Sequence, residues 1–67
     1  MKRYMVVYEI GCAPAGAFFT EVYGDAVAMV NGIVRTFGAS SCAQLYEWSK
    51  DNGSYEFLFE GWNYEKY

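Results

Sequence analysis

The pair Asn52-Gly53 is the feature of this sequence that most restricts how the chain can fold. It stands between two runs of alternating residues, at about 43–50 and 54–60. A type I′ turn needs positive φ at both central residues, and Asn-Gly between alternating runs is the strongest short-range signal for a β-hairpin. The sequence therefore predicts two antiparallel strands joined by a two-residue turn.

This turn divides the side chains of the hairpin between two faces, because successive residues of a strand point to opposite sides. One face is expected to pair Trp48 with Phe57, Tyr46 with Phe59, and Lys50 with Tyr55. The other face is expected to hold Leu45, Glu47, Ser49, Glu56, Leu58 and Glu60. An antiparallel sheet commonly has one dry face and one wet face. We expect the aromatic stripe to form the core beneath a helix and the acidic face to meet water.

Two further strands are predicted at about 3–10 and 17–23, since both runs are rich in β-branched and aromatic residues. Residues 11–16 lie between them and contain two glycines and Pro14, which indicates a loop. The two strands are expected to form a hairpin, and the sequence leaves the register of their pairing open. Phe18 and Phe19 are adjacent, so both cannot point inward.

A single helix is predicted at about 25–37. Its apolar residues recur at helical spacing on one face, and they are Ala26, Val27, Val30, Ile33, Val34 and Phe37. Asp25 is placed to act as the N-cap. Gly38 is placed to end the helix with positive φ.

These elements predict one α+β domain over residues 1–67, a two-layer ββαββ fold with a four-stranded antiparallel sheet and one helix packed on one face. The order of the strands in the sheet stays open. Aromatic residues make up 21% of the 67 residues. A core of this size is small, so we expect some aromatic surface to remain exposed and to favour association.

The charge balance argues against several classes of function. The net charge is −3, and only five residues are basic, whereas nucleic-acid binding usually relies on a basic patch. The chain has no histidine, which removes the commonest general base and metal ligand. We expect no enzyme, no cofactor and no metal site. Two cysteines without histidine supply half of a structural zinc site at best.

The expected location is the cytoplasm, without membrane contact. The first apolar run contains Glu9 and is too short for a signal sequence or a membrane span. Cys12 and Cys42 are therefore expected to be reduced thiols, with Cys42 a small core residue and Cys12 more exposed.

Two groups of residues are candidates for binding a partner. Glu47, Glu56 and Glu60 form either a solvated strand face or an acidic strip that meets a basic partner. The last residues of the chain contain Trp62, Tyr64 and Tyr67. These rings either anchor an interface or fold back to close the core.

The sequence favours a non-enzymatic protein-interaction module that binds another protein, a second copy of itself, or both. A small inhibitor or accessory factor of bacterial or phage origin fits this composition. The alternative is a single-stranded nucleic-acid or nucleotide binder that stacks bases on an aromatic sheet face.

Overall fold

The computed structural model describes residues 2–11 and 13–62, and it confirms the predicted order of elements. Strands β1 (Tyr4–Ile10) and β2 (Ala13–Thr20) precede helix α1 (Tyr23–Phe37). A short 3-10 helix (Gly38–Ser40) leads into β3 (Ser41–Ser49), and β4 (Ser54–Trp62) follows. The result is the expected α+β, ββαββ fold.

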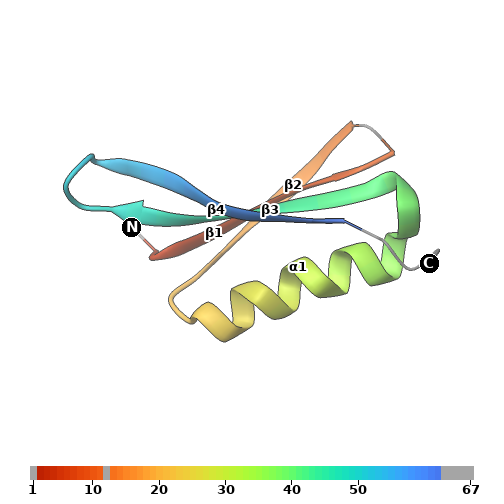
Figure 1. Ribbon diagram of the computed structural model, residues 1–67, viewed down its shortest axis with the longest axis horizontal. Helices are drawn as coiled ribbons and strands as arrows, with labels where there is room; N and C mark the ends of the chain where they lie inside the picture. The colour runs from red at the N-terminus through yellow and green to blue at the C-terminus, as the bar shows by residue number, and fades with distance from the viewer. Residues whose placement is uncertain (1, 12, 63–67) are drawn as a thin grey trace.

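The four strands form one antiparallel sheet in the order β2-β1-β3-β4. The central strands β1 and β3 come from different hairpins, and this pairing settles the strand order that the sequence left open. Helix α1 packs on one face of the sheet (Figure 1). Among the described residues, no helix or strand covers the other face.

The core lies between the helix and the two central strands. It consists of Tyr4, Val6, Ala26, Val30, Ile33, Ala43 and Leu45. Since side chains alternate along a strand, the buried positions of β1 and β3 define the helix-side face of the sheet. The intervening positions, including Met5, Val7, Tyr46 and Trp48, define what we call the open face.

Small residues on the helix side explain why the helix lies there. Ala43 pairs with Gly61 across β3 and β4, and Val30 of the helix lies over Gly61. A Cβ atom at Gly61 would come within 2.6 Å of the Val30 Cγ1 atom.

The first hairpin is tighter than predicted. Residues 11–16 were expected to be a loop, but β2 begins at Ala13, and Gly11 turns the chain with a φ of 64°. Pro14 lies inside β2, which is possible because β2 is an edge strand and a bulge interrupts the pairing beside it. The strand ends at Thr20 rather than residue 23. Phe18 packs against the core while Phe19 is 45% exposed, so the two rings do point opposite ways.

The helix starts earlier than predicted. It begins at Tyr23 with Val22 as the N-cap residue, so Asp25 lies in the first turn and the prediction that it caps the helix was wrong. In the segment between β2 and the helix, the Thr20 hydroxyl accepts a hydrogen bond from the Val22 amide. Gly38 has a φ of 79° and ends the helix as predicted.

The helix stripe also differs at its end. Ala26, Val30 and Ile33 are buried and Val27 packs against the core. Phe37 was predicted to lie over the sheet, but it is 48% exposed. It is the last helical residue, and the chain turns away there into the 3-10 helix.

The predicted two-residue turn of the second hairpin was wrong. Ser49 pairs with Ser54, so the loop has four residues, and Trp48 pairs with Tyr55 instead of Phe57. The Ser49 side chain accepts a hydrogen bond from the Asn52 amide, and the Gly53 amide donates to the Ser49 carbonyl. Gly53, with a φ of 67°, still turns the chain. Lys50 lies in the loop and does not pair with Tyr55.

A bulge in the same hairpin changes which residues share a face. Leu45 pairs with Phe59 while its neighbour Tyr46 pairs with Phe57, which leaves Leu58 as an extra residue. A bulge of this kind shifts the alternation of one strand. Phe59 therefore lies on the helix side, and Glu60, paired with Gln44, lies on the open face.

The assignment of the aromatic stripe to the core was wrong. Tyr46, Trp48, Tyr55 and Phe57 do share one face, but it is the open face, and only Phe59 packs against the core. Leu45, predicted on the wet side, is fully buried. The helix packs instead on the face that carries Leu45 and the small residues Ala43 and Gly61.

No helix within the described ranges is both long and apolar enough to cross a membrane.

Candidate functional site: the open face of the sheet

The open face carries an aromatic patch on the half of the sheet nearest the β3–β4 loop. The patch consists of Met5, Phe19, Tyr46, Trp48, Tyr55 and Phe57. All four strands contribute to it. Phe57 is 56% exposed, and Tyr46, Trp48 and Tyr55 are half-buried.

The rings of this patch contact one another. Trp48 and Tyr55 pack edge to face with centroids 5.1 Å apart, and Tyr46 and Phe57 do so at 5.8 Å. Phe19 and Tyr55 lie 6.1 Å apart, although they come from the two edge strands. Such pairs favour a fixed arrangement over independent rotation of each ring. The patch is therefore an ordered apolar surface.

A hydrogen bond from its side chain to the backbone of Lys2 holds Tyr55 in place. Its hydroxyl donates to the Lys2 carbonyl at 2.6 Å. This bond satisfies the polar end of the ring and leaves its apolar part in the patch. It also places the start of the chain at the margin of the patch.

The other half of the open face is polar and acidic. The Gln44 amide donates to Glu60 at 2.8 Å and to the Cys42 sulfur at 3.4 Å. The Cys42 thiol in turn contacts a Glu9 oxygen at 3.7 Å. Glu9 and Glu60 give this end of the face two negative charges. The open face is thus divided into an aromatic half and an acidic half.

Cys42 is not the core residue that was predicted. It is half-buried on the open face and carries a free thiol. Burial, together with the nearby Glu9 and Glu60 carboxylates, raises the pKa of this thiol. A raised pKa keeps the sulfur protonated at neutral pH and makes it a poor nucleophile.

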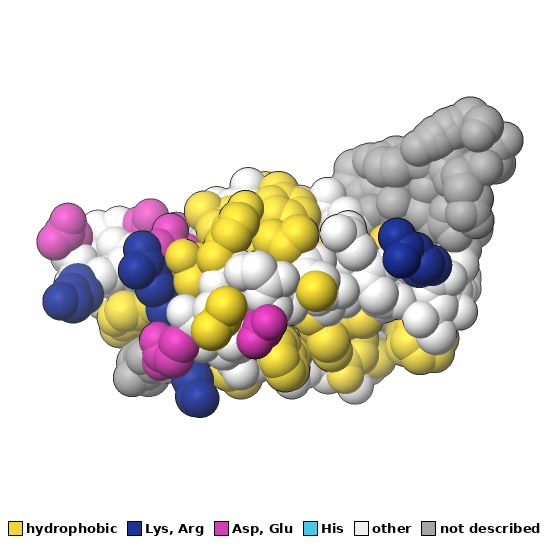
Figure 2. All heavy atoms as spheres, turned by 90° about the horizontal axis from the view of Figure 1, so that it is seen from below, with side chains coloured by type: hydrophobic (Ala, Val, Ile, Leu, Met, Phe, Trp, Pro, Cys, Tyr) yellow, Lys and Arg dark blue, Asp and Glu magenta, His cyan; other side chains and the backbone are white. Residues whose placement is uncertain are grey.

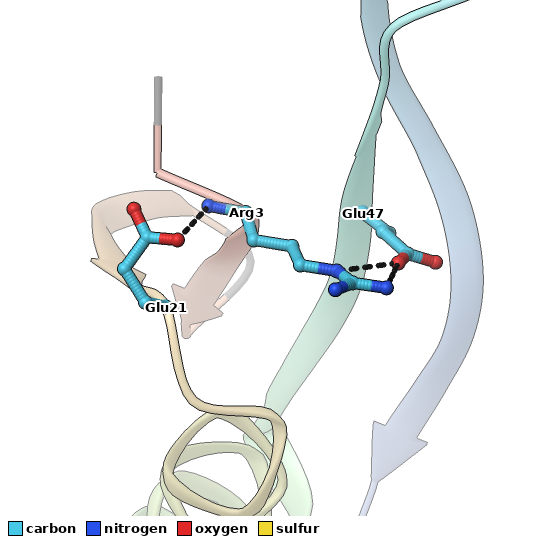
Figure 3. Close-up of polar contacts among 3 residues, drawn as sticks. All are labelled: Arg3, Glu21 and Glu47. Atoms are coloured by element: carbon cyan, nitrogen blue, oxygen red, sulfur yellow. Dashed lines mark hydrogen bonds and ion pairs between the residues drawn. The ribbon is translucent and has the colours of Figure 1, made fainter.

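An open depression of about 680 Å³ lies at the loop end of the second hairpin. Its lining includes Arg3, Glu21, Glu47 and Glu56. The Arg3 guanidinium binds Glu47 at 2.8 Å, and the Arg3 amide donates to Glu21 at 3.3 Å (Figure 3). From the helix side, charged side chains crowd toward this end of the molecule and hydrophobic ones cover the middle (Figure 2).

The three predicted glutamates do not form one strip. Glu47 and Glu56 are directly opposite each other on the helix-side face, beyond the core, but Glu60 lies on the open face. The bulge at Leu58 separates Glu60 from the other two. Like charges directly opposite destabilise a sheet, and here Arg3 binds Glu47 while the Asn52 side chain binds Glu56. Both carboxylates are engaged within the chain.

The role expected for Trp62, Tyr64 and Tyr67, as interface anchors or as a cover for the core, stays a prediction. Trp62 is the last residue of β4. Its side chain, and Tyr64 and Tyr67 entirely, lie outside the described residues. Cys12 lies outside them as well.

Within residues 2–11 and 13–62, no group of three or more cysteine, aspartate or glutamate side chains is placed to hold a metal ion. Comparisons with protein-family models, with curated proteins and with solved structures gave no significant match for this chain.

The sequence held a signal for the face of the sheet that the helix leaves uncovered, and hydrophobicity alone obscured it. Ala43 and Gly61 are small residues, which suit strand positions that pack closely against a helix. Two-residue periodicity then assigns Leu45 to the helix side and Tyr46 and Trp48 to the opposite side. Size complementarity with the helix, rather than the number of apolar atoms, identifies the open face.

Proposed function

We propose that this chain is a non-enzymatic protein-interaction module whose binding surface is the aromatic half of the open face. The observation that carries the proposal is the position of Phe19, Tyr46 and Phe57 on the face that no described helix or strand covers. Contiguous apolar surface of this kind marks interaction sites on small proteins. Tyrosine, tryptophan and phenylalanine are also the residues enriched in protein interfaces.

The surrounding charges favour a protein partner over a nucleic acid. The acidic half adds Glu9 and Glu60 to the same face, and the whole chain has a net charge of −3. A phosphate backbone would be repelled by these carboxylates, and few cations are available to release counterions. A small inhibitor or accessory factor of bacterial or phage origin, acting by covering a partner's surface, is the form of module we propose.

Single-stranded nucleic acid remains the second candidate because of one observation. The rings lie on an uncovered sheet face, as they do in proteins that stack bases on a sheet. In this chain Tyr46, Trp48 and Tyr55 are half-buried and meet neighbouring rings edge to face, which leaves less flat surface for stacking.

A pair of matched variants tests the proposed surface. Phe57→Glu places a charge in the patch, and Phe37→Glu places one on a phenylalanine of similar exposure at the end of the helix. Proteins captured by the immobilised chain, and its own self-association, are expected to be lost with Phe57→Glu and kept with Phe37→Glu. Circular dichroism checks that both variants fold.

Equal behaviour of the two folded variants would contradict the proposed surface. The nucleic-acid alternative is tested by titrating labelled single strands at low salt. We expect no saturable binding. Tight, salt-sensitive binding that Phe57→Glu abolishes would replace the proposal with the alternative.

A further inference from the structure

The open face has two halves of different character. Its aromatic half lies toward the β3–β4 loop, and its acidic half, with Glu9 and Glu60, lies at the other end of the strands. Lys50 is exposed in the loop, and the backbone of Lys2 contacts Tyr55 at the margin of the patch. Asp51, also in the loop, offsets part of this positive charge. The acidic half is therefore the more negative end of the face, and Lys50 provides a cation at the other end.

We infer that the partner of the open face is a second copy of this chain, bound face to face about a two-fold axis that runs across the strands. The inference rests on the proposed function and names its partner. The axis passes through the aromatic patch, so that the rings of one copy pack on the rings of the other. An isologous interface of this kind uses the same surface on both subunits.

The direction of the axis follows from charge. An axis along the strands would place the acidic half of one copy on the acidic half of the other, with four carboxylates facing each other. An axis across the strands reverses the second copy. With the axis near position 47 of β3, Lys50 lies three residues to one side and Gln44, the partner of Glu60 in the sheet, three residues to the other. Lys50 of one copy then lies beside Glu60 of the other.

The size of the face predicts a reversible dimer. Strands are about 4.8 Å apart and rise about 3.3 Å per residue, so four strands of about seven residues cover roughly 450 Å². Two such faces bury on the order of 900 Å², close to the lower limit of about 1,000 Å² for specific interfaces. A dissociation constant in the micromolar range is expected, and packing of sheets face to face at about −30° suits the geometry.

Sedimentation equilibrium over a wide range of protein concentration tests the inference, with four chains compared. Wild type is expected to move from monomer to dimer. Lys50→Glu and Glu60→Lys are each expected to weaken the dimer at least threefold at low salt. The combined variant Lys50→Glu/Glu60→Lys is expected to regain most of the loss, because the attraction is restored with its signs exchanged.

Each outcome decides between arrangements. If Glu60→Lys alone strengthened the dimer, the axis would run along the strands and the inference would be wrong. If the dimer formed equally with Phe57→Glu, it would use another surface, which would also overturn the inference. If the chain stayed monomeric but captured a different protein through Phe57, the second copy would be excluded and the proposed function would stand. A monomer that captures nothing would remove both.

Discussion

Gly61 shows how one residue without a side chain selects the covered face of the sheet. It lies in β4 opposite Ala43, directly beneath Val30. The strand was predicted to span about 54–60, but it continues through Gly61 to Trp62. The glycine is needed for close approach of the helix, and a strand end is not its role.

Gly61→Ala is predicted to destabilise the protein by about 1–3 kcal/mol, because overpacking forces the helix or its side chains to shift. The added Cβ would meet the Val30 Cγ1 atom at 2.6 Å. In a Val30→Ala background the same substitution is expected to cost much less. Urea denaturation of the four chains measures this coupling, and equal costs in both backgrounds would show that the contact does not limit the packing.

The Cys42 thiol is predicted to react slowly with iodoacetamide. Burial raises its pKa, so at pH 8 a smaller fraction is thiolate than in an unfolded chain, whose thiol has a pKa of about 8.5. The folded state holds the thiol proton more tightly than the unfolded chain does. The contribution of this thiol to stability is therefore fully present below the unfolded pKa, and it is lost as the pH rises through the raised pKa of the folded state.

The measurement uses a Cys12→Ser chain, in which Cys42 is the single remaining cysteine. Alkylation rates are followed against pH with and without denaturant. The rate profile of the folded chain is expected to lie at higher pH. A profile at the same or lower pH would mean that the polar contacts around the sulfur outweigh its burial.

At the scale of the elements, the bulge in β4 decides which aromatic rings of this strand lie on the open face. Before the bulge, Tyr55 and Phe57 lie on the open face, and after it Phe59 lies on the helix side. If the strand alternated without interruption, Tyr55, Phe57 and Phe59 would all lie on the same face of the sheet. The bulge allows one strand to supply both the aromatic patch and the core.

Deletion of Leu58 is predicted to be tolerated. Phe57 and Phe59 would become neighbours that point to opposite faces, so every side chain keeps its present side and the ladder becomes regular. Leu58 is 42% exposed, and changes at exposed positions cost little, so the expected cost is within about 1 kcal/mol. Deletion of Gln44 from β3 is the control, since it slips a central strand and inverts its faces.

Urea denaturation and circular dichroism compare the two deletions. The chain without Leu58 is expected to keep the wild-type spectrum, while the chain without Gln44 is expected to unfold. If both deletions unfolded the chain, the bulge would be required for the twist of the hairpin, and the prediction that its extra residue can be removed would be wrong.

At the scale of the whole molecule, the proposed association would contribute to stability. A domain of 67 residues has a small core, here held by two central strands and one helix. The open face exposes Phe19 and Phe57 to water, and a partner that binds only the folded chain would stabilise it by mass action.

The melting temperature is therefore predicted to rise with protein concentration. A dimer that forms only from folded chains shifts the unfolding equilibrium in proportion to the logarithm of concentration. The expected shift is a few degrees over a hundredfold range, measured by calorimetry, and it should disappear in Phe57→Glu. A concentration-independent melting temperature in wild type would contradict dimerisation through the open face.

The sequence by itself determined the order of elements, the two hairpins, the helix end at Gly38, and the sharing of one face by Tyr46, Trp48, Tyr55 and Phe57. These depend on residues close together in the chain, through turn chemistry and the two periodicities of strand and helix. Only the tertiary structure decided the strand order, the bulge at Leu58 and the face that the helix covers. Those depend on how Ala43, Gly61 and Val30 fit one another. The sequence shows the small residues, but only the tertiary structure shows that residues so far apart in the chain meet.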